Sequence, residues 1–271
     1  MPSTTCLIRT LLLTLGLAST PPLACAADDY PARPIRMVVG FAAGGATDLF
    51  ARIIGQKLAD RLGQQVNVDN RTGAGGSLGT DIVAKAPPDG YTLLMVSASH
   101  AINLSLYKSL PFDPVADFDP ICTAVATSNV LAVHPSLPAS TLAEFLALAR
   151  AKPGGINLAS AGTGSSSHLA GELFKSMAGI TLVHVPYKGT ADALRDLLSG
   201  QVQATVDALP ALLPHINRGT LRALGVGDAR RIALLPNVPT IAEGGVPGYE
   251  VFAWTGVVAP AKTPRPVIDK L

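Results

Sequence analysis

Residues 35–62 are IRMVVGFAAGGATDLFARIIGQKLADRL, and they pass from an apolar run through a glycine-rich loop into a helical pattern. The run at 35–39 is short and apolar, which is typical of a buried strand. Beyond Gly45, apolar residues recur at three- and four-residue spacing, which predicts an amphipathic helix that Thr47 or Asp48 can cap. The apolar face of this helix consists of Leu49, Phe50, Ile53, Ile54, Leu58 and Leu62.

The loop between this strand and helix is suited to an anion. Gly44 and Gly45 bring no side chains, so the backbone N–H groups from Ala43 to Gly45 are free to donate, and the helix start adds partial positive charge. A tight turn is the alternative, because glycine adopts positive φ without strain. Asp48 fits either a ligand contact or a first-turn carboxylate that stabilises the helix dipole. We therefore expect Ala43, Gly44, Gly45 and Asp48 to be ligand-binding residues.

The same order of elements returns in the second half of the chain. Residues 156–160 form a predicted strand, residues 161–167 a loop of small residues, and residues 168–177 a predicted helix. This alternation predicts mostly parallel sheets flanked by crossover helices. If the halves before and after about residue 127 face each other, the two helix starts point into one cleft. The sequence therefore predicts a two-lobed α/β protein that binds a small anion between its lobes.

Polar residues near strand ends supply further candidates, because open α/β sheets bind ligands at the carboxyl ends of their strands. His168, on a first helical turn, fits a structural hydrogen bond better than a titrating role. Lys188 fits a ligand contact and a solvated surface charge equally well. Asp207 fits either a contact with an ammonium group of a ligand or a structural contact with backbone groups. The candidates at these positions are Ser97, Ser99, His100, Ser160, Gly162, Thr163, Gly164, Ser165, His168, Tyr187, Lys188 and Asp207.

Composition excludes several classes of protein. The formal net charge is +2 and hydrophobic residues make up 48% of the chain, so no basic surface predicts nucleic-acid binding and a sizeable core is available. The sequence holds no HExxH, CxxC or P-loop lysine motif, and we expect no metal and no cofactor.

The first 26 residues have the pattern of a secretory signal peptide. A single charge, Arg9, precedes an apolar run at 11–18, and small residues at 24–26 predict cleavage after Ala26 or Ala27. Lipoprotein anchoring at Cys25 is less favoured, because Pro22 stands where such signals carry an aliphatic residue. Cys122 would then be the single thiol of the mature protein, which rules out an internal disulfide.

Several short motifs recur in order from residue 33 onward. They are RPI at 33–35, FAAGGATD at 41–48, NRTGAGG at 70–76, PDGYTL at 88–93, and FDP at 112–114 followed by DF at 117–118. The later ones are AGTGS at 161–165 with HL at 168–169, VPYKG at 185–189, NVPT at 237–240 with Glu243 and Gly245, and Trp254 with AP at 259–260. On these motifs the chain resembles the Bug (Bordetella uptake gene) family, the extracytoplasmic solute-binding proteins of tripartite tricarboxylate transporters.

The resemblance implies a two-lobed periplasmic binding protein of the type II kind and a small carboxylate ligand, namely an organic acid, an aromatic acid or an acidic amino acid. It implies that two loops hold this ligand, residues 41–48 and residues 160–168. The first of these loops adds Phe41 to the expected ligand-binding residues. The expected boundaries are 27–127 plus 252–271 for the first lobe and 128–251 for the second. We expect a periplasmic monomer that serves membrane permease subunits and has no catalytic residues. Family members usually add C-terminal helices, which we expect to be missing here.

Two other functions compete with this interpretation. Residues 75–79 fit the G-x-S-x-G motif of serine hydrolases, with Ser77 as the nucleophile and with Asp207 and His215 later in the chain. However, that motif places its serine directly at the end of a strand, and here glycines separate the two. A ligand sensor that presents its bound state to a membrane partner is compatible with the same fold.

Overall fold

The computed structural model describes residues 30–271, so the predicted signal peptide and Cys25 lie outside the described residues. Its helices are α1 (Ala46–Leu62), α2 (Ser77–Ala84), α3 (Ser99–Leu106), α4 (Leu142–Ala151), α5 (Ser166–Ala178), α6 (Thr190–Leu198), α7 (Leu209–Asn217) and α8 (Arg265–Lys270). Its strands are β1 (Ile35–Val39), β2 (Val66–Asn70), β3 (Thr92–Ser97), β4 (Phe118–Val133), β5 (Asn157–Ser160), β6 (Val183–Pro186), β7 (Ala204–Ala208), β8 (Arg222–Val226) and β9 (Phe252–Pro260). Within residues 30–271, no helix has both the length and the apolar character needed to cross a membrane.

The first lobe is built on β1, which lies between β2 and β3 and runs parallel to both. Alternate side chains of a strand point to opposite faces of its sheet. Accordingly, Met37 packs in a cluster with Ala51 of α1, whereas Val38 packs in a cluster with Val83 of α2. Helices on both faces explain why β1 is almost continuously apolar.

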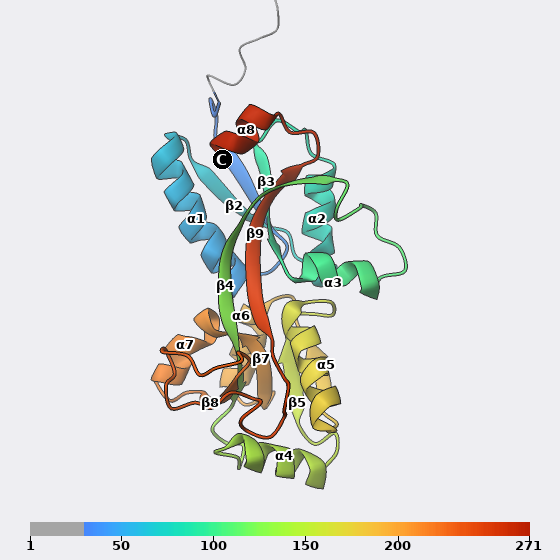
Figure 1. Cartoon of the computed structure of the whole chain (residues 1–271), viewed down its shortest axis with the longest axis vertical. Helices are drawn as coiled ribbons and strands as arrows, with labels where there is room; N and C mark the ends of the chain where they lie inside the picture. The colour runs from blue at the N-terminus through green and yellow to red at the C-terminus, as the bar shows by residue number, and fades with distance from the viewer. Residues whose placement is uncertain (1–29) are drawn as a thin grey trace, which may run out of the picture.

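The second lobe repeats this arrangement around β5, which is parallel to β6 and to β7. One core cluster joins this sheet to Phe145 of α4 and Phe174 of α5. A second cluster on the other face includes Leu197 of α6 and Leu212 of α7. The fold is therefore a two-lobed α/β structure with helices on both faces of each sheet (Figure 1).

Two long strands, β4 and β9, run antiparallel between the lobes (Figure 1). From Phe118 to Ser128, β4 pairs with β9, and from Asn129 to Val133 it pairs with β7. The sequence has two separate apolar runs here, 121–126 and 130–133, which are typical of two strands, but the structure joins them in one strand. The chain stays extended through Thr127–Asn129 because each half of β4 has hydrogen-bonding partners in a different part of the sheet.

The lobes touch each other at the mouth of the space between them, where the loop that contains Ala42 faces the loop that contains Lys188. The Ala42 N–H donates to the Lys188 carbonyl at 3.3 Å, which links the loop after β1 to the loop after β6. Ala46 and Phe50 of α1 pack with Ala208 and Ala253. The structure therefore has the two lobes closed on one another.

Two details of α1 differ from the sequence prediction. Gly45, with extended φ and ψ, is the residue that caps the helix, rather than Thr47 or Asp48. Leu49 and Ile53 were assigned to the buried face, but they are 41% and 52% exposed. The helix instead buries Ala51 and Gly55, because the small residues let it approach the sheet closely.

Candidate functional site

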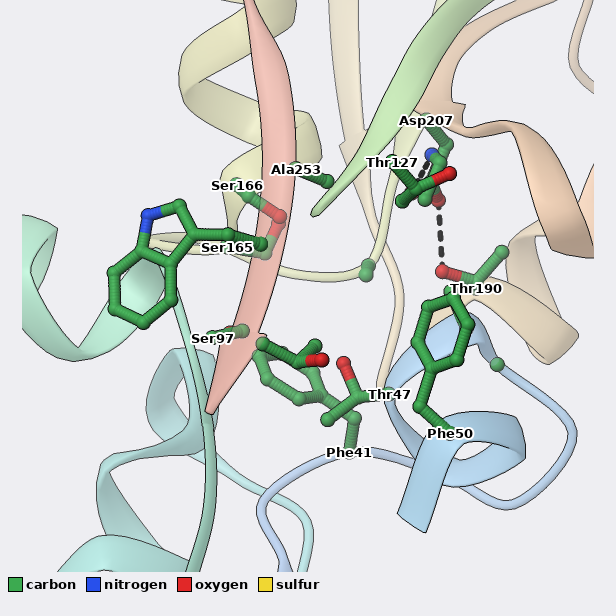
Figure 2. Close-up of a pocket in the computed structure, with 16 residues that line it drawn as sticks. Phe41, Thr47, Phe50, Ser97, Thr127, Ser165, Ser166, Thr190, Asp207 and Ala253 are labelled. Carbon is green, nitrogen blue, oxygen red and sulfur yellow. Dashed lines mark hydrogen bonds between the residues drawn. The ribbon is translucent and has the colours of Figure 1, made fainter. Parts of the chain in front are cut away.

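The interlobe cleft lies where the lobes meet and has about 490 Å³ of empty space between its walls, part of it open to solvent. The first lobe, the connecting strands and the second lobe all contribute to it. It is lined by Phe41, Gly45, Ala46, Thr47, Phe50, Ser97, Thr127, Ala161, Ser165, Ser166, Thr190, Asp207, Ala208, Ala253, Trp254 and Thr255. In Figure 2, Asp207 and Thr190 lie on one side of the cleft, and Ser165 and Ser166 lie on another.

Four helices begin at the interlobe cleft. Its lining includes the N-cap residues Gly45 of α1, Ser165 of α5 and Ala208 of α7, together with Thr190, the first residue of α6. The N–H groups in a first helical turn have no partner within the helix, and the aligned peptide dipoles place partial positive charge there. Four such ends around one space create a favourable field for an anion.

Asp207 is the only ionisable side chain among the described residues that line the interlobe cleft. It is 5% exposed and its two oxygens accept hydrogen bonds from the Thr190 hydroxyl at 2.8 Å and from the Ala208 N–H at 2.7 Å (Figure 2). Burial raises the pKa of Asp207 to about 6, and the two hydrogen bonds oppose that shift only in part. A proton is therefore retained on this carboxyl group at mildly acidic pH.

Hydroxyl groups supply the other polar surface of the cleft. Thr255 is buried, and its hydroxyl oxygen has no hydrogen-bond partner in the described part of the chain. Ser97 is engaged, because its hydroxyl lies 2.8 Å from that of Ser99. Since buried polar groups are normally paired, the Thr255 hydroxyl is a group that a ligand or a water molecule would satisfy.

A second space, the glycine chamber, adjoins the interlobe cleft and shares Phe41 and Ala161 with it. Its empty volume, part of it open to solvent, is about 520 Å³. It is lined by Gly40, Phe41, Gly73, Ala74, Gly75, Gly76, Tyr107, Ala161, Gly162, Thr163, Pro186, Tyr187 and Lys188. The close approach of loops from opposite lobes requires glycine here, since a Cβ at Gly75 would lie 2.5 Å from the Thr163 carbonyl.

The structure brings about half of the sequence-predicted residues to these two spaces. The ones that line the interlobe cleft are Phe41, Gly45, Ser97, Ser165 and Asp207. Those that line the glycine chamber are Phe41, Gly162, Thr163, Tyr187 and Lys188. Outside both linings are Ala43, Gly44, Asp48, Ser99, His100, Ser160, Gly164 and His168.

Internal contacts occupy two of the residues outside both linings. The Asp48 carboxylate, 2% exposed, accepts from the Gly44 N–H at 2.9 Å, from Arg52 and from Asn70. Burial opposes its ionisation, but these hydrogen bonds outweigh burial and lower the pKa of Asp48. His100 lies beside a different, apolar groove and its Nε2 is 2.8 Å from the Pro114 carbonyl oxygen. Asp48 therefore shapes the first glycine loop, and His100 faces away from the cleft.

Sequence reasoning missed the cleft residues that depend on the closure of the lobes. Thr190, Ala208 and Thr255 lie next to candidates or motifs, but no local pattern separates them from ordinary capping and strand residues. Thr47 was considered only as a helix cap. A systematic search for every predicted helix start would have found Thr190, because the glycine before it ends the motif at 185–189.

The hydrolase arrangement is not formed. Ser77 is the first residue of α2, it is buried, and its hydroxyl accepts a hydrogen bond from Asn103 at 3.0 Å. His215 lies on α7, where its Nδ1 contacts Arg218. Among the described residues no hydrogen bond joins Ser77 to a histidine, so the serine lacks the base that activates such a nucleophile.

Comparison with known proteins gives a consistent result. The family model described as the tripartite tricarboxylate transporter family receptor matches residues 50–271. Protein BugT of Bordetella pertussis is 41% identical over 263 residues, which cover 96% of this chain and 79% of that protein.

Two solved structures are similar throughout the fold. A protein from Rhodopseudomonas palustris with adipate has a TM-score of 0.87 at 41% identity, over 89% of this chain and 81% of that one. MatC from Rhodopseudomonas palustris with bound malate has a TM-score of 0.85 at 35% identity, over 89% of this chain and 82% of that one.

Proposed function

Because this chain belongs to the tripartite tricarboxylate transporter receptor family, a family of binding receptors and not of enzymes, we propose that it binds a small carboxylate in the interlobe cleft and delivers it to a membrane permease. The observation that carries this proposal is the meeting of four helix N-termini at one cleft, whose lining has no Lys or Arg among the residues that the structure describes. Backbone N–H groups and hydroxyls bind a carboxylate by hydrogen bonds, and the helix dipoles favour its charge.

The glycine chamber extends the site in a way that suits a longer acid. One carboxylate would be held near Gly45, Ser165 and Thr190, and the rest of the ligand would reach past Phe41 toward Lys188. Malate and adipate, which two similar proteins hold in their structures, are dicarboxylates of different length. We therefore expect a dicarboxylate or an acidic amino acid rather than a monocarboxylate.

The remaining parts of the proposal concern the whole protein. The lobes would be residues 27–127 plus 252–271 and residues 128–251, a division supported by the change of partner strand on β4 after Ser128. Residues 1–26 would direct export to the periplasm, where a monomer would bind its ligand and present the closed form to the permease.

A panel of acids tests the ligand class. The mature protein is heated with malate, adipate, glutamate, benzoate or the diamide of adipate, and its melting temperature is measured. We expect at least one dianionic acid to raise the melting temperature and the uncharged diamide to leave it unchanged. If the diamide stabilises as well as its acid, recognition of the carboxylate charge is excluded.

Substitution at the contact between the lobes tests the site itself. A Cβ at Gly189 would lie 2.8 Å from both the N and the Cβ of Ala42 across the closed mouth, and its φ of 164° is one that alanine accepts. Gly189→Ala should therefore weaken the binding of an acid identified in the panel by about tenfold or more while the free protein remains folded, because only the closed form is disfavoured.

Gly179→Ala is the matched control, since nothing lies within 4 Å of its Cβ position and its left-handed φ of 61° affects folding alone. It should lower stability by about 1 kcal/mol and leave affinity unchanged. Equal affinity of the Gly189→Ala variant and the natural protein would contradict binding between closed lobes.

A further inference from the structure

We propose that His168, Glu172 and His184 form a binding site for a divalent transition-metal ion of the Zn²⁺ class, on the second lobe behind the loop that enters α5. The three residues offer one ligand atom each, and these atoms lie within 4.8 Å of one another. This inference concerns a site outside the interlobe cleft and stands independently of carboxylate binding.

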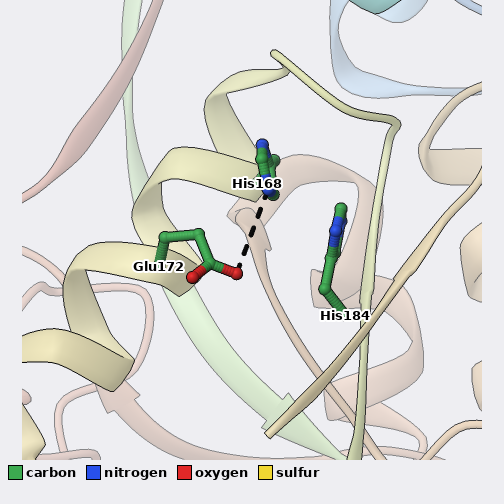
Figure 3. Close-up of side chains that lie close together, drawn as sticks. All are labelled: His168, Glu172 and His184. Carbon is green, nitrogen blue, oxygen red and sulfur yellow. Dashed lines mark ion pairs between the residues drawn. The ribbon is translucent and has the colours of Figure 1, made fainter.

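The fold places the three side chains together from two elements. His168 and Glu172 are four residues apart on α5, so they share one face of the helix, and His168 Nε2 is 3.9 Å from Glu172 Oε1 (Figure 3). His184 lies on β6, the last strand of the sheet, with its ring centroid 4.1 Å from that of His168. The two rings are stacked, with 22° between their planes. Zn–N bonds of about 2.0–2.1 Å place tetrahedral donors roughly 3.3 Å apart, so both rings must turn about their side-chain bonds to aim a nitrogen at one ion.

The donor set matches the chemistry of the proposed ion. Two imidazoles and one carboxylate are ligands of Zn²⁺ and Cu²⁺, and they leave a fourth position for water. Imidazole binds metal in its neutral form.

One cation already occupies part of this cluster. The Lys175 ammonium donates to both oxygens of Glu172, at 2.7 and 2.9 Å. A metal ion must displace this ammonium from the carboxylate, which limits affinity in the natural chain. Removing the charge at Lys175 should therefore strengthen metal binding, an effect opposite to that expected if Lys175 merely holds the site together.

Metal binding would also change a hydrogen bond of the loop before α5, which lines the interlobe cleft and the glycine chamber. His168 Nδ1 now accepts from the Gly164 N–H at 3.2 Å, so the proton of the neutral ring resides on Nε2. When Nε2 binds the metal, the proton moves to Nδ1 and the hydrogen bond from Gly164 is lost. His184 can keep its 2.6 Å contact between Nε2 and the Ser160 hydroxyl while its Nδ1 takes the metal.

Titration of the full mature chain, with any affinity tag removed, tests the site. Zn²⁺ is added in competition with a chromophoric chelator to the natural protein and to His184→Gln, Lys175→Met and the control His134→Gln. His134 is the matched control because it is a histidine outside the cluster, and its Nδ1 contacts Ser136. We expect one Zn²⁺ per chain, at least about tenfold weaker binding in His184→Gln, tighter binding in Lys175→Met and no change in the control.

Co²⁺ provides a readout that does not depend on how the variants fold. A tetrahedral site with nitrogen and oxygen donors gives visible d–d absorption with the natural chain. Absence of that absorption, a Zn²⁺ affinity that His184→Gln and His134→Gln change equally, or weaker binding in Lys175→Met would each overturn the proposal.

Discussion

Substitution of Asp207 by asparagine should make the ligand-free protein more stable at neutral pH. Unfolded, the carboxyl group loses its proton near its ordinary pKa of 3.8, and in the folded protein it does so near 6. Between these values the folded state holds more protons than the unfolded state, so the free energy of unfolding falls as the pH rises. The difference of about 2 pKa units corresponds to about 3 kcal/mol, and the loss is complete about one pH unit above the folded-state pKa of about 6.

Asparagine removes this penalty and keeps most of the hydrogen bonding. Its carbonyl oxygen can accept from the Ala208 N–H, and its amide can donate to the Thr190 hydroxyl, which rotates to accept. The variant should therefore match the natural protein near pH 4 and exceed it by up to about 3 kcal/mol at pH 7.5. In melting temperature this is roughly 6–12 °C, at about 2–4 °C per kcal/mol for a chain of this size.

Urea unfolding of both proteins from pH 4 to pH 8, without ligand, measures the effect. Every other titrating group is shared, so its contribution cancels in the difference between the two curves. A difference that stays constant across this range would refute the raised pKa of Asp207, and with it the effect of burial on this carboxyl group.

Three further substitutions test the local interpretations. Asp48→Asn should lower the free energy of unfolding by about 2 kcal/mol at pH 7, because it breaks the buried contacts to Arg52 and Gly44. This loss should shrink at acid pH, where the natural carboxylate with its lowered pKa becomes protonated. A loss that does not depend on pH in urea unfolding would contradict this. Tyr249→Phe should lower the free energy of unfolding by about 1 kcal/mol at all pH values, because the buried Tyr249 hydroxyl donates to the Ala170 carbonyl at 3.0 Å. Urea unfolding measures this, and an unchanged midpoint would show that the hydrogen bond contributes nothing. Thr141→Ala should lower the urea midpoint by the equivalent of about 1 kcal/mol, because Thr141 and Glu144 form a capping box at α4. The slope of the unfolding free energy against urea concentration should not change, and a changed slope would indicate a different unfolded state.

Local signals were sufficient for the two strand–loop–helix units. The structure has β1 at Ile35–Val39 and α1 at Ala46–Leu62, and it has β5 and α5 on either side of the second small-residue loop. These units are predictable because glycine loops and apolar spacing act over a few residues. Helix α7 was missed, since Pro210 and Pro214 within Leu209–Asn217 are normally signs of a loop.

Features that depend on partners distant in sequence could not be found in the same way. The continuous strand β4 exists because residues near 250 and near 205 pair with its two halves. The cluster of His168, Glu172 and His184 has the same origin. Its helical pair is visible as a four-residue spacing, but the third residue is brought in by the pairing of β5 with β6, which sets Leu158 opposite His184.

Few polar links join the two closed lobes in the described part of the chain. All ion pairs among residues 30–271 join groups within one lobe, and the loops across the mouth share the Ala42 to Lys188 hydrogen bond at 3.3 Å. The apolar contact of Phe50, Ala208 and Ala253 is small.

With so few polar links, we expect the closed form to be a minor species without ligand. If it made up about 1–10% of the free protein, the apparent affinity would be about 10–100 times lower than that of a permanently closed site. A carboxylate bound as we propose, with donors from both lobes contacting it at once, would supply the missing free energy. Affinity would then depend on the mouth as much as on the cleft, so we expect a substitution at the mouth to change how tightly an acid is bound without touching it.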